Sequence, residues 1–120
     1  MIVPVHLGVH WCLSIIDFQE KKISYLDSMG GKNQACLDAL KQYLIDEHQD
    51  KKSSSYDVSN WTLECLKDIP QQMNGSDCGM FACTFAEFTC RRAPYTFTQA
   101  HMPLLRRKMA LEILLGKLLL

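Results

Sequence analysis

The feature that most constrains this chain is a polar, glycine-bearing stretch at residues 71–79, followed at once by an apolar run at residues 80–88. The polar stretch, Gln-Gln-Met-Asn-Gly-Ser-Asp-Cys-Gly, is typical of a turn. The apolar run carries its phenylalanines at helical spacing, at Phe81, Phe85 and Phe88. Cys78 is therefore expected where a loop becomes a helix, and the unpaired N–H groups and positive dipole there favour a thiolate. The position equally suits a buried structural cysteine with Asp77 as the helix cap, so both interpretations stay open.

Length and composition limit the classes of protein that this chain can belong to. A chain of 120 residues holds one domain with one modest core. Lys+Arg and Asp+Glu both number 13, so no long-range field selects nucleic acid or an acidic membrane. No apolar run is long enough to span a membrane. The 6 cysteines form no CxxC pair and no signal peptide is evident, which predicts reduced thiols in a cytosolic or nuclear protein.

Hydrophobic patterning predicts three strands and three helices in mixed order, hence an α+β fold. The expected strands are residues 11–18, 23–27 and 61–65, after a loosely alternating start at 2–6, and the expected helices run from Asn33 to about Glu47, from Cys78 to near residues 91–94, and from about Gln99 to Leu115. Asn33 and Thr98 are the expected caps of the first and last helices. The last helix places Met102, Leu105, Met109 and Ile113 on one face. Its basic triplet, residues 106–108, is expected to be a solvated face rather than a nucleic-acid patch.

A cysteine nucleophile needs a base, and the base needs a partner that orients it. His10 and Asp27 are candidates, because a hairpin of residues 11–18 and 23–27 places both on one face. One register puts Asp27 opposite Ser14, about 13 Å along the strand from His10. Another pairs Asp27 directly with His10 and needs an earlier turn. The two registers differ by an even number of residues, so the shared face is the same in both, and the choice between them stays open.

Two further kinds of site can be weighed from the sequence. The backbone N–H of Cys78 and the side-chain amide of Gln72 could both stabilise an oxyanion, although Gln72 alone would also suit a solvated turn. His6, His10 and Cys12 lie close enough in sequence to bind zinc, but no fourth ligand follows at standard spacing. We therefore expect no metal and no cofactor.

Four segments, in this order, resemble the C-terminal half of the catalytic domain of SUMO-specific (sentrin-specific) cysteine proteases. They are His-Leu-Gly-Val-His-Trp at 6–11, Tyr-Leu-Asp-Ser-Met at 25–29, Gln-Gln-Met-Asn-Gly-Ser-Asp-Cys-Gly at 71–79, and Phe-Thr-Gln-Ala-His-Met-Pro at 97–103. The resemblance spans nearly the whole chain. It implies a papain-like α+β fold of the ubiquitin-like-protein protease type, with residues 1–120 forming the C-terminal portion of the domain only.

The resemblance also assigns roles to residues of this chain. By motif match the site consists of the nucleophile Cys78, the general base and later acid His10, its orienting partner Asp27, the oxyanion donor Gln72, and the substrate-binding residues Trp11 and His6. Trp11 matches the tryptophan that such enzymes lay against the di-glycine tail of SUMO. The implied reaction is hydrolysis after that di-glycine, in a SUMO precursor or at the isopeptide bond to a lysine. SUMO and SUMO-conjugated proteins are the implied partners, and the nucleus, with the cytoplasm as alternative, is the implied location.

By the same resemblance, the N-terminal part of the family's domain lies outside this sequence, with its helices, much of its SUMO-binding surface and a second tryptophan. Apolar faces that pack on that part are then expected to be exposed. Two functions follow as hypotheses. The chain is either the C-terminal portion of an active SUMO-specific cysteine protease, or a catalytically silent fragment that at most binds SUMO or a partner.

Overall fold

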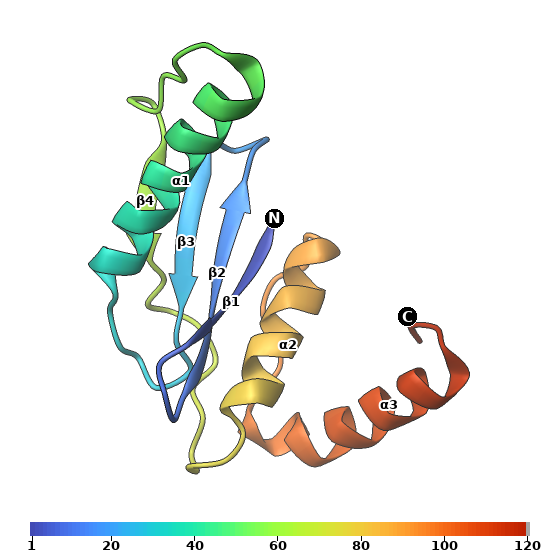
Figure 1. The fold of residues 1–120 in the computed structure, drawn as a ribbon. Helices are drawn as coiled ribbons and strands as arrows, with labels where there is room; N and C mark the ends of the chain where they lie inside the picture. Colours follow the sequence, from blue (N-terminus) through green and yellow to red (C-terminus); the bar gives the residue numbers. More distant parts are fainter. Residues whose placement is uncertain (120) are drawn as a thin grey trace.

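The computed structural model describes residues 1–119 and shows a four-stranded mixed sheet with a helix against each face (Figure 1). The elements in chain order are β1 (Ile2–His6), β2 (Trp11–Asp17), β3 (Lys22–Leu26), α1 (Gln34–Lys52), β4 (Thr62–Cys65), α2 (Cys78–Cys90), the 3₁₀ helix η1 (Gln99–His101) and α3 (Met102–Leu115). The sheet order is β1-β2-β3-β4, in which only β3 and β4 are parallel. The predicted α+β class is confirmed.

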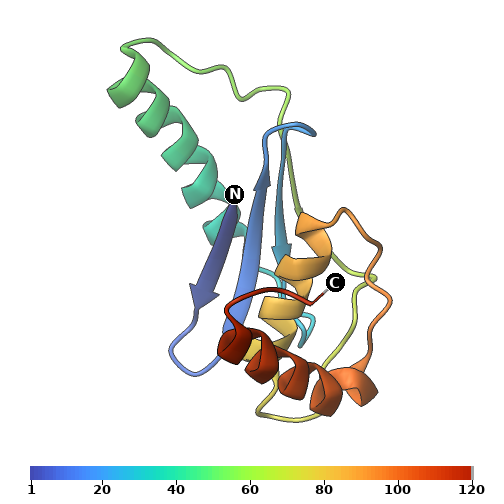
Figure 2. The ribbon, with the colours of Figure 1, turned by 90° about the vertical axis from the view of Figure 1, so that its right-hand side faces the viewer.

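The two faces of the sheet bury separate cores. Along β2, Cys12 and Ile16 pack with α1, whereas Leu13 and Ile15 pack with α2, as the alternation of a strand requires. Five consecutive positions of β2 are therefore buried, and the expected burial on both faces is confirmed. Helix α3 lies on the side of α2 away from the sheet (Figure 1), so in the turned view it crosses in front of α2 (Figure 2). None of the helices in residues 1–119 has both the length and the hydropathy needed to cross a bilayer.

Helix α1 begins as predicted and runs further than predicted. The Asn33 side chain accepts a hydrogen bond of 3.0 Å from the backbone N–H of Cys36, which caps the first turn. Past Glu47 the apolar pattern fades, yet the polar residues that follow include no helix breaker, so the helix continues to Lys52. Ser53 then adopts a left-handed conformation and its N–H closes on a carbonyl of the last turn.

The last helix differs from its predicted form in two ways. Thr98 caps a short 3₁₀ turn, η1, and the α-helix proper begins only at Met102. Leu105, Met109 and Ile113 line the same hollow, as their predicted common face requires, but burial decreases along that face from Met102, which is fully buried, to Ile113, which is 75% exposed. The axis of α3 leads away from the sheet (Figure 1), and its C-terminal turns leave Leu114 and Leu115 exposed as well.

Two turns place the predicted base and its partner. Between β1 and β2, Gly8 takes a φ of 88°, and the N–H of Leu7 donates to the carbonyl of His10 at 2.8 Å. Between β2 and β3 the observed pairing joins Leu13 to Leu26, so neither predicted register is right. Continued by one residue, it sets Asp27 opposite Cys12, with His10 two residues further along the same face.

Candidate active site

His10 and Asp27 form a hydrogen-bonded pair at one end of the two central strands, where β2 begins and β3 ends. The distance from His10 Nε2 to Asp27 Oδ1 is 2.7 Å. Burial on its own would raise the pKa of Asp27, but the hydrogen bond from His10 and those from the backbone N–H groups of Met29 and Gly31 outweigh it and lower the pKa. The carboxylate is thus ionised at neutral pH and accepts the Nε2 proton, which leaves His10 Nδ1 as the basic nitrogen.

The backbone after β3 is shaped around the Asp27 carboxylate. The N–H of Met29 donates to Oδ1 at 2.8 Å and the N–H of Gly31 donates to Oδ2 at 3.2 Å. A Cβ at Gly31 would lie 2.5 Å from that same oxygen, so only glycine lets the backbone approach so closely. Asp27 itself is 7% exposed, and its orientation is therefore held from three sides.

Two cysteines lie in this region, and their surroundings differ. Cys12 is fully buried, and its sulfur lies within 4.8 Å of ligand atoms of His10 and Asp27. Burial raises the pKa of Cys12 to about 11, so it is a neutral thiol at pH 7. Cys78 is partly exposed and is the first residue of α2. Of the two, only Cys78 combines access to solvent with the helix start that stabilises a thiolate.

The histidines weighed for zinc do not come together. The cluster of possible ligand atoms consists of His10, Cys12 and Asp27, and His6 is not part of it. His10 and Asp27 are already bonded to each other, and Cys12 holds its proton. These donors are better explained as a base with its orienting carboxylate beside a buried thiol than as a metal site.

Cys78 opens onto an apolar cleft of about 600 Å³. Trp11, at the start of β2, forms one wall and is 43% exposed. Gly79 lies beneath it, where a Cβ would be 3.9 Å from Trp11 Cδ1. His6, paired with Trp11 across β1 and β2, places its ring 4.4 Å from the indole, centroid to centroid. The predicted substrate-binding pair is thus adjacent, with His6 supporting the indole.

Gln72 lies in the loop before α2 and is tied to the end of β3. Its backbone N–H donates to the carbonyl of Ser28 at 2.8 Å. Its side-chain Nε2 donates to the carbonyl of Asn74 at 2.6 Å, and its Oε1 accepts from the Ser28 hydroxyl at 2.5 Å. The segment after β3 that contains Asp27 and Ser28 therefore also fixes Gln72, the predicted oxyanion donor.

The Asp77 side chain anchors the same loop to the C-terminal helices. Asp77 stands at the N-cap position of α2, as the sequence suggested, but its side chain makes no cap hydrogen bond. Its carboxylate instead accepts from Asn74 and Gln99, each at 2.8 Å, and from Arg106. The bonds from Asn74, Arg106 and Gln99 lower the pKa of Asp77 to about 2. Arg106, which was expected to face solvent, thus forms an ion pair with the buried carboxylate of Asp77.

We expect replacement of Asp77 by asparagine to lower the free energy of unfolding by about 1.5 kcal/mol near neutral pH. The lower end of the range for hydrogen bonds to a charged group applies, because the Arg106 side chain is 50% exposed and solvent screens the pair. The folded pKa of Asp77 lies below its unfolded value of about 3.9, so the stabilisation is present above about pH 4 and is lost as the pH falls toward 2.

Urea unfolding of the wild-type chain and of Asp77→Asn at a series of pH values between 6 and about 3 measures this difference. The gap between the two proteins should narrow as the pH falls. Asp50→Asn, at an exposed position of α1, is the matched control and should follow the wild-type curve. A gap that stays constant with pH would assign the loss to packing rather than to the Asp77 charge.

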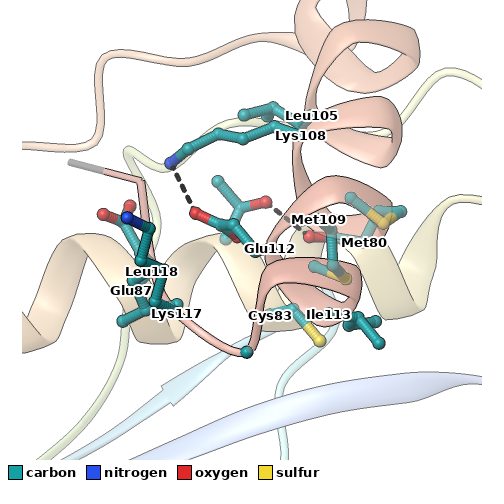
Figure 3. A pocket seen from close by; sticks show the side chains of 12 residues that line it. Met80, Cys83, Glu87, Leu105, Lys108, Met109, Glu112, Ile113, Lys117 and Leu118 are labelled. Atoms are coloured by element: carbon teal, nitrogen blue, oxygen red, sulfur yellow. Dashed lines mark hydrogen bonds and ion pairs between the residues drawn. The ribbon is translucent and has the colours of Figure 1, made fainter.

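A second hollow lies between α2 and α3 and holds none of the predicted site residues (Figure 3). Among its charged residues, Lys108 pairs with Glu112 at 3.4 Å. Met80 and Met109 supply apolar walls. This hollow is therefore separate from the cleft onto which Cys78 opens.

The structure brings the predicted residues His10 and Asp27 into contact, and it places Cys78 and Trp11 on one cleft, with His6 packed against the Trp11 ring outside the cleft lining. Sequence reasoning missed the residues that support the loop, which are Ser28, Asn74, Gln99 and Arg106. Ser28, Asn74 and Gln99 lay within the recognised motifs, and that was the only signal of their importance.

Comparison with known proteins places these observations in a family. The Ulp1 protease family, C-terminal catalytic domain, matches residues 1–117. A sentrin-specific protease of Caenorhabditis elegans is 50% identical over 119 residues, which are 99% of this chain and 17% of the relative. Sentrin-specific protease 2 of Homo sapiens is 49% identical over 121 residues, which are 99% of this chain and 20% of the relative.

Comparison with solved structures indicates the same family. The C-terminal Ulp1 protease domain in complex with SMT3, the yeast ortholog of SUMO, superposes with a TM-score of 0.83 at 33% identity, covering 95% of this chain and 51% of that chain. The present chain thus spans about half of that solved domain and about a fifth of the curated relatives. The predicted papain-like fold of the ubiquitin-like-protein protease type is confirmed. This chain belongs to the Ulp1 protease family.

Proposed function

We propose that this chain carries the thiol site of a SUMO-specific protease, which hydrolyses the peptide or isopeptide bond after the SUMO di-glycine. The observation that carries the proposal is the 2.7 Å bond between His10 Nε2 and Asp27 Oδ1, because Trp11, the residue after His10, lines the cleft onto which Cys78 opens at a helix start. A base oriented by a carboxylate beside an accessible thiol is the arrangement that thiol-based acyl transfer requires.

The substrate class is supported by the cleft and by the relatives. Trp11 lies against Gly79 and lines the cleft onto which Cys78 opens, and by the resemblance to the family this tryptophan would lie along a di-glycine tail. The relatives are named sentrin-specific proteases, and one solved relative is in complex with the yeast ortholog of SUMO. SUMO and SUMO-conjugated proteins are therefore the proposed partners, and the nucleus is the proposed location.

The first half of the reaction forms an acyl-enzyme. His10 Nδ1 takes the proton of the Cys78 thiol, and the sulfur attacks the carbonyl carbon of the terminal glycine while the carbonyl electrons move onto oxygen. The backbone N–H of Cys78 and the Gln72 amide stabilise that oxyanion. The carbon–nitrogen bond then breaks, and the imidazolium returns its proton to the leaving amine. Asp27 stabilises the imidazolium between these two transfers.

The second half releases SUMO. His10 removes a proton from water, and the resulting hydroxide attacks the thioester carbonyl. The oxyanion forms again at the same donors and collapses, which breaks the carbon–sulfur bond. The proton on His10 passes to the departing sulfur, and Cys78 is ready for another cycle. The products are the SUMO carboxylate and the free amine, with one water consumed.

A SUMO probe that bears a thiol-reactive group in place of its last glycine tests this proposal on the unmodified 120-residue chain. We expect a covalent adduct that peptide mass spectrometry locates on Cys78. The same reactive group on a short di-glycine peptide is the companion probe, because it needs only the cleft and the nucleophile. Circular dichroism establishes that the chain is folded under the conditions used.

The two probes separate the competing functions. Labelling by both supports a working thiol site that also recognises SUMO. Labelling by the peptide alone would retain the thiol site and contradict SUMO recognition by this chain. A folded chain that reacts with neither probe would overturn the proposal in favour of a silent fragment.

A further inference from the structure

We propose that Ser28 is a positioning residue for the reaction, because its hydroxyl fixes the orientation of the Gln72 side-chain amide. The inference rests on the proposed function, in which Gln72 donates a hydrogen bond to the oxyanion. Ser28 touches neither the cleft nor Cys78 in the described structure. Its effect on the reaction would therefore be transmitted entirely through Gln72.

The hydrogen bonds define which end of the amide faces which neighbour. The backbone carbonyl of Asn74 can only accept, so the amide atom 2.6 Å from it must be the nitrogen. The other amide atom, Oε1, then faces Ser28 Oγ at 2.5 Å, and the hydroxyl must be the donor. One amide N–H is used by Asn74, and the second meets no acceptor among residues 1–119. That second N–H is the one free to stabilise an oxyanion.

Ser28 and Asn74, the two hydrogen-bond partners of the Gln72 side-chain amide, are themselves held in place. Ser28 is 2% exposed, and its carbonyl accepts the backbone N–H of Gln72 at 2.8 Å, so main chain and side chain are clamped by one residue. Asn74 is held in turn by its 2.8 Å bond to the Asp77 carboxylate. A glutamine side chain is otherwise among the most mobile in a protein, and locking it before the substrate arrives removes that ordering cost from the transition state.

The position of Ser28 in the chain gives this contact its significance. Ser28 directly follows Asp27, which orients His10. One strand end would therefore align both the general base and the oxyanion donor. The contact joins residues 44 positions apart, so it fixes the loop before α2 relative to the sheet.

Replacement of Ser28 by alanine removes the side-chain bond and leaves the carbonyl clamp in place. We expect kcat for hydrolysis of a SUMO C-terminal fluorogenic amide to fall about three- to ten-fold, the equivalent of one ordinary hydrogen bond, with KM unchanged. Ser24→Ala is the matched control, because Ser24 is a buried serine of β3, four residues before Ser28, that makes no hydrogen bond with Gln72, and it should leave kcat unchanged.

A double-mutant cycle distinguishes positioning from general support of the fold. Gln72→Ala alone should lower kcat about 10²- to 10³-fold. In that background Ser28→Ala should have no further effect, because the amide that it orients is gone. A structural role would lower kcat by the same factor in both backgrounds. If alanine at Ser28 unfolds the chain, the shape-matched pair Ser28→Thr and Ser28→Val replaces it, and only the threonine variant should keep the wild-type kcat.

A measurement without turnover completes the test. In ¹⁵N NMR relaxation, the Gln72 side-chain NH₂ should be rigid in the wild-type chain and mobile in Ser28→Ala. A normal rate in Gln72→Ala would overturn the role proposed for Gln72 itself. A slow Gln72→Ala together with a normal rate and a rigid amide in Ser28→Ala would overturn the positioning role and leave the proposed function intact.

Discussion

Replacement of Cys78 by serine is expected to reduce kcat about a million-fold, the scale seen when a hydrolase loses its nucleophile. A serine hydroxyl is far less acidic and less nucleophilic than a thiol, so a helix start and a histidine base do not turn it into an alkoxide. The side chains are nearly equal in size and Cys78 is partly exposed, so the fold should be kept.

The measurement is hydrolysis of a SUMO C-terminal fluorogenic amide under single-turnover conditions, with a thermal melt of each variant. Cys90→Ser is the matched control, because Cys90 is an exposed cysteine at the opposite end of the same helix, and its rate should match the wild type. Substantial activity in Cys78→Ser would move the nucleophile elsewhere. Cys12 would be a poor alternative nucleophile, since burial raises its pKa to about 11 and keeps the thiol protonated at neutral pH.

The parts of the structure that follow local rules could be predicted from the sequence. Asn33 caps α1 because its side chain needs only an N–H three residues ahead, and β2 is buried on both faces because its side chains are apolar on both. The strand-to-strand register could not be chosen, because it depends on the conformation of the residue 18–21 loop. There Lys21 takes a φ of 52°, a state that lysine rarely adopts.

The supports of the site could not be predicted for a related reason. Asp77 was a reasonable helix cap by its position, and Arg106 was a reasonable solvated residue by its neighbours. Their pairing across 29 residues depends on the angle between α2 and α3, which no local pattern contains. The bond from Ser28 to Gln72 likewise exists only once the loop before α2 has folded against β3. Motif resemblance can point to such residues, but only the structure shows what they hold.

Replacement of Asp27 by asparagine is expected to lower kcat about 10⁴-fold with little change in KM, the second largest effect at this site. Asp27 is ionised at neutral pH because the bonds from His10, Met29 and Gly31 overcome the effect of burial and lower its pKa. Asparagine keeps the shape but has one amide nitrogen, which meets donors whichever way it turns. With the nitrogen toward His10, the histidine loses the acceptor for its Nε2 proton, and with the nitrogen toward Gly31 it keeps only a neutral acceptor, which holds the tautomer less strongly than a carboxylate.

The rate should fall because the proton moves to the wrong nitrogen. With Nδ1 protonated, His10 cannot accept the proton of Cys78, so ¹⁵N NMR of His10 should report a change of tautomer along with the lower kcat. Asp38→Asn, at an exposed position of α1, controls for the loss of a charge. An unchanged rate and tautomer would show that the turn from Leu7 to His10 suffices to orient the base. That turn constrains only the backbone of His10, whereas the imidazole can still rotate about its side-chain torsions, and Asp27 is the described group that stops this rotation.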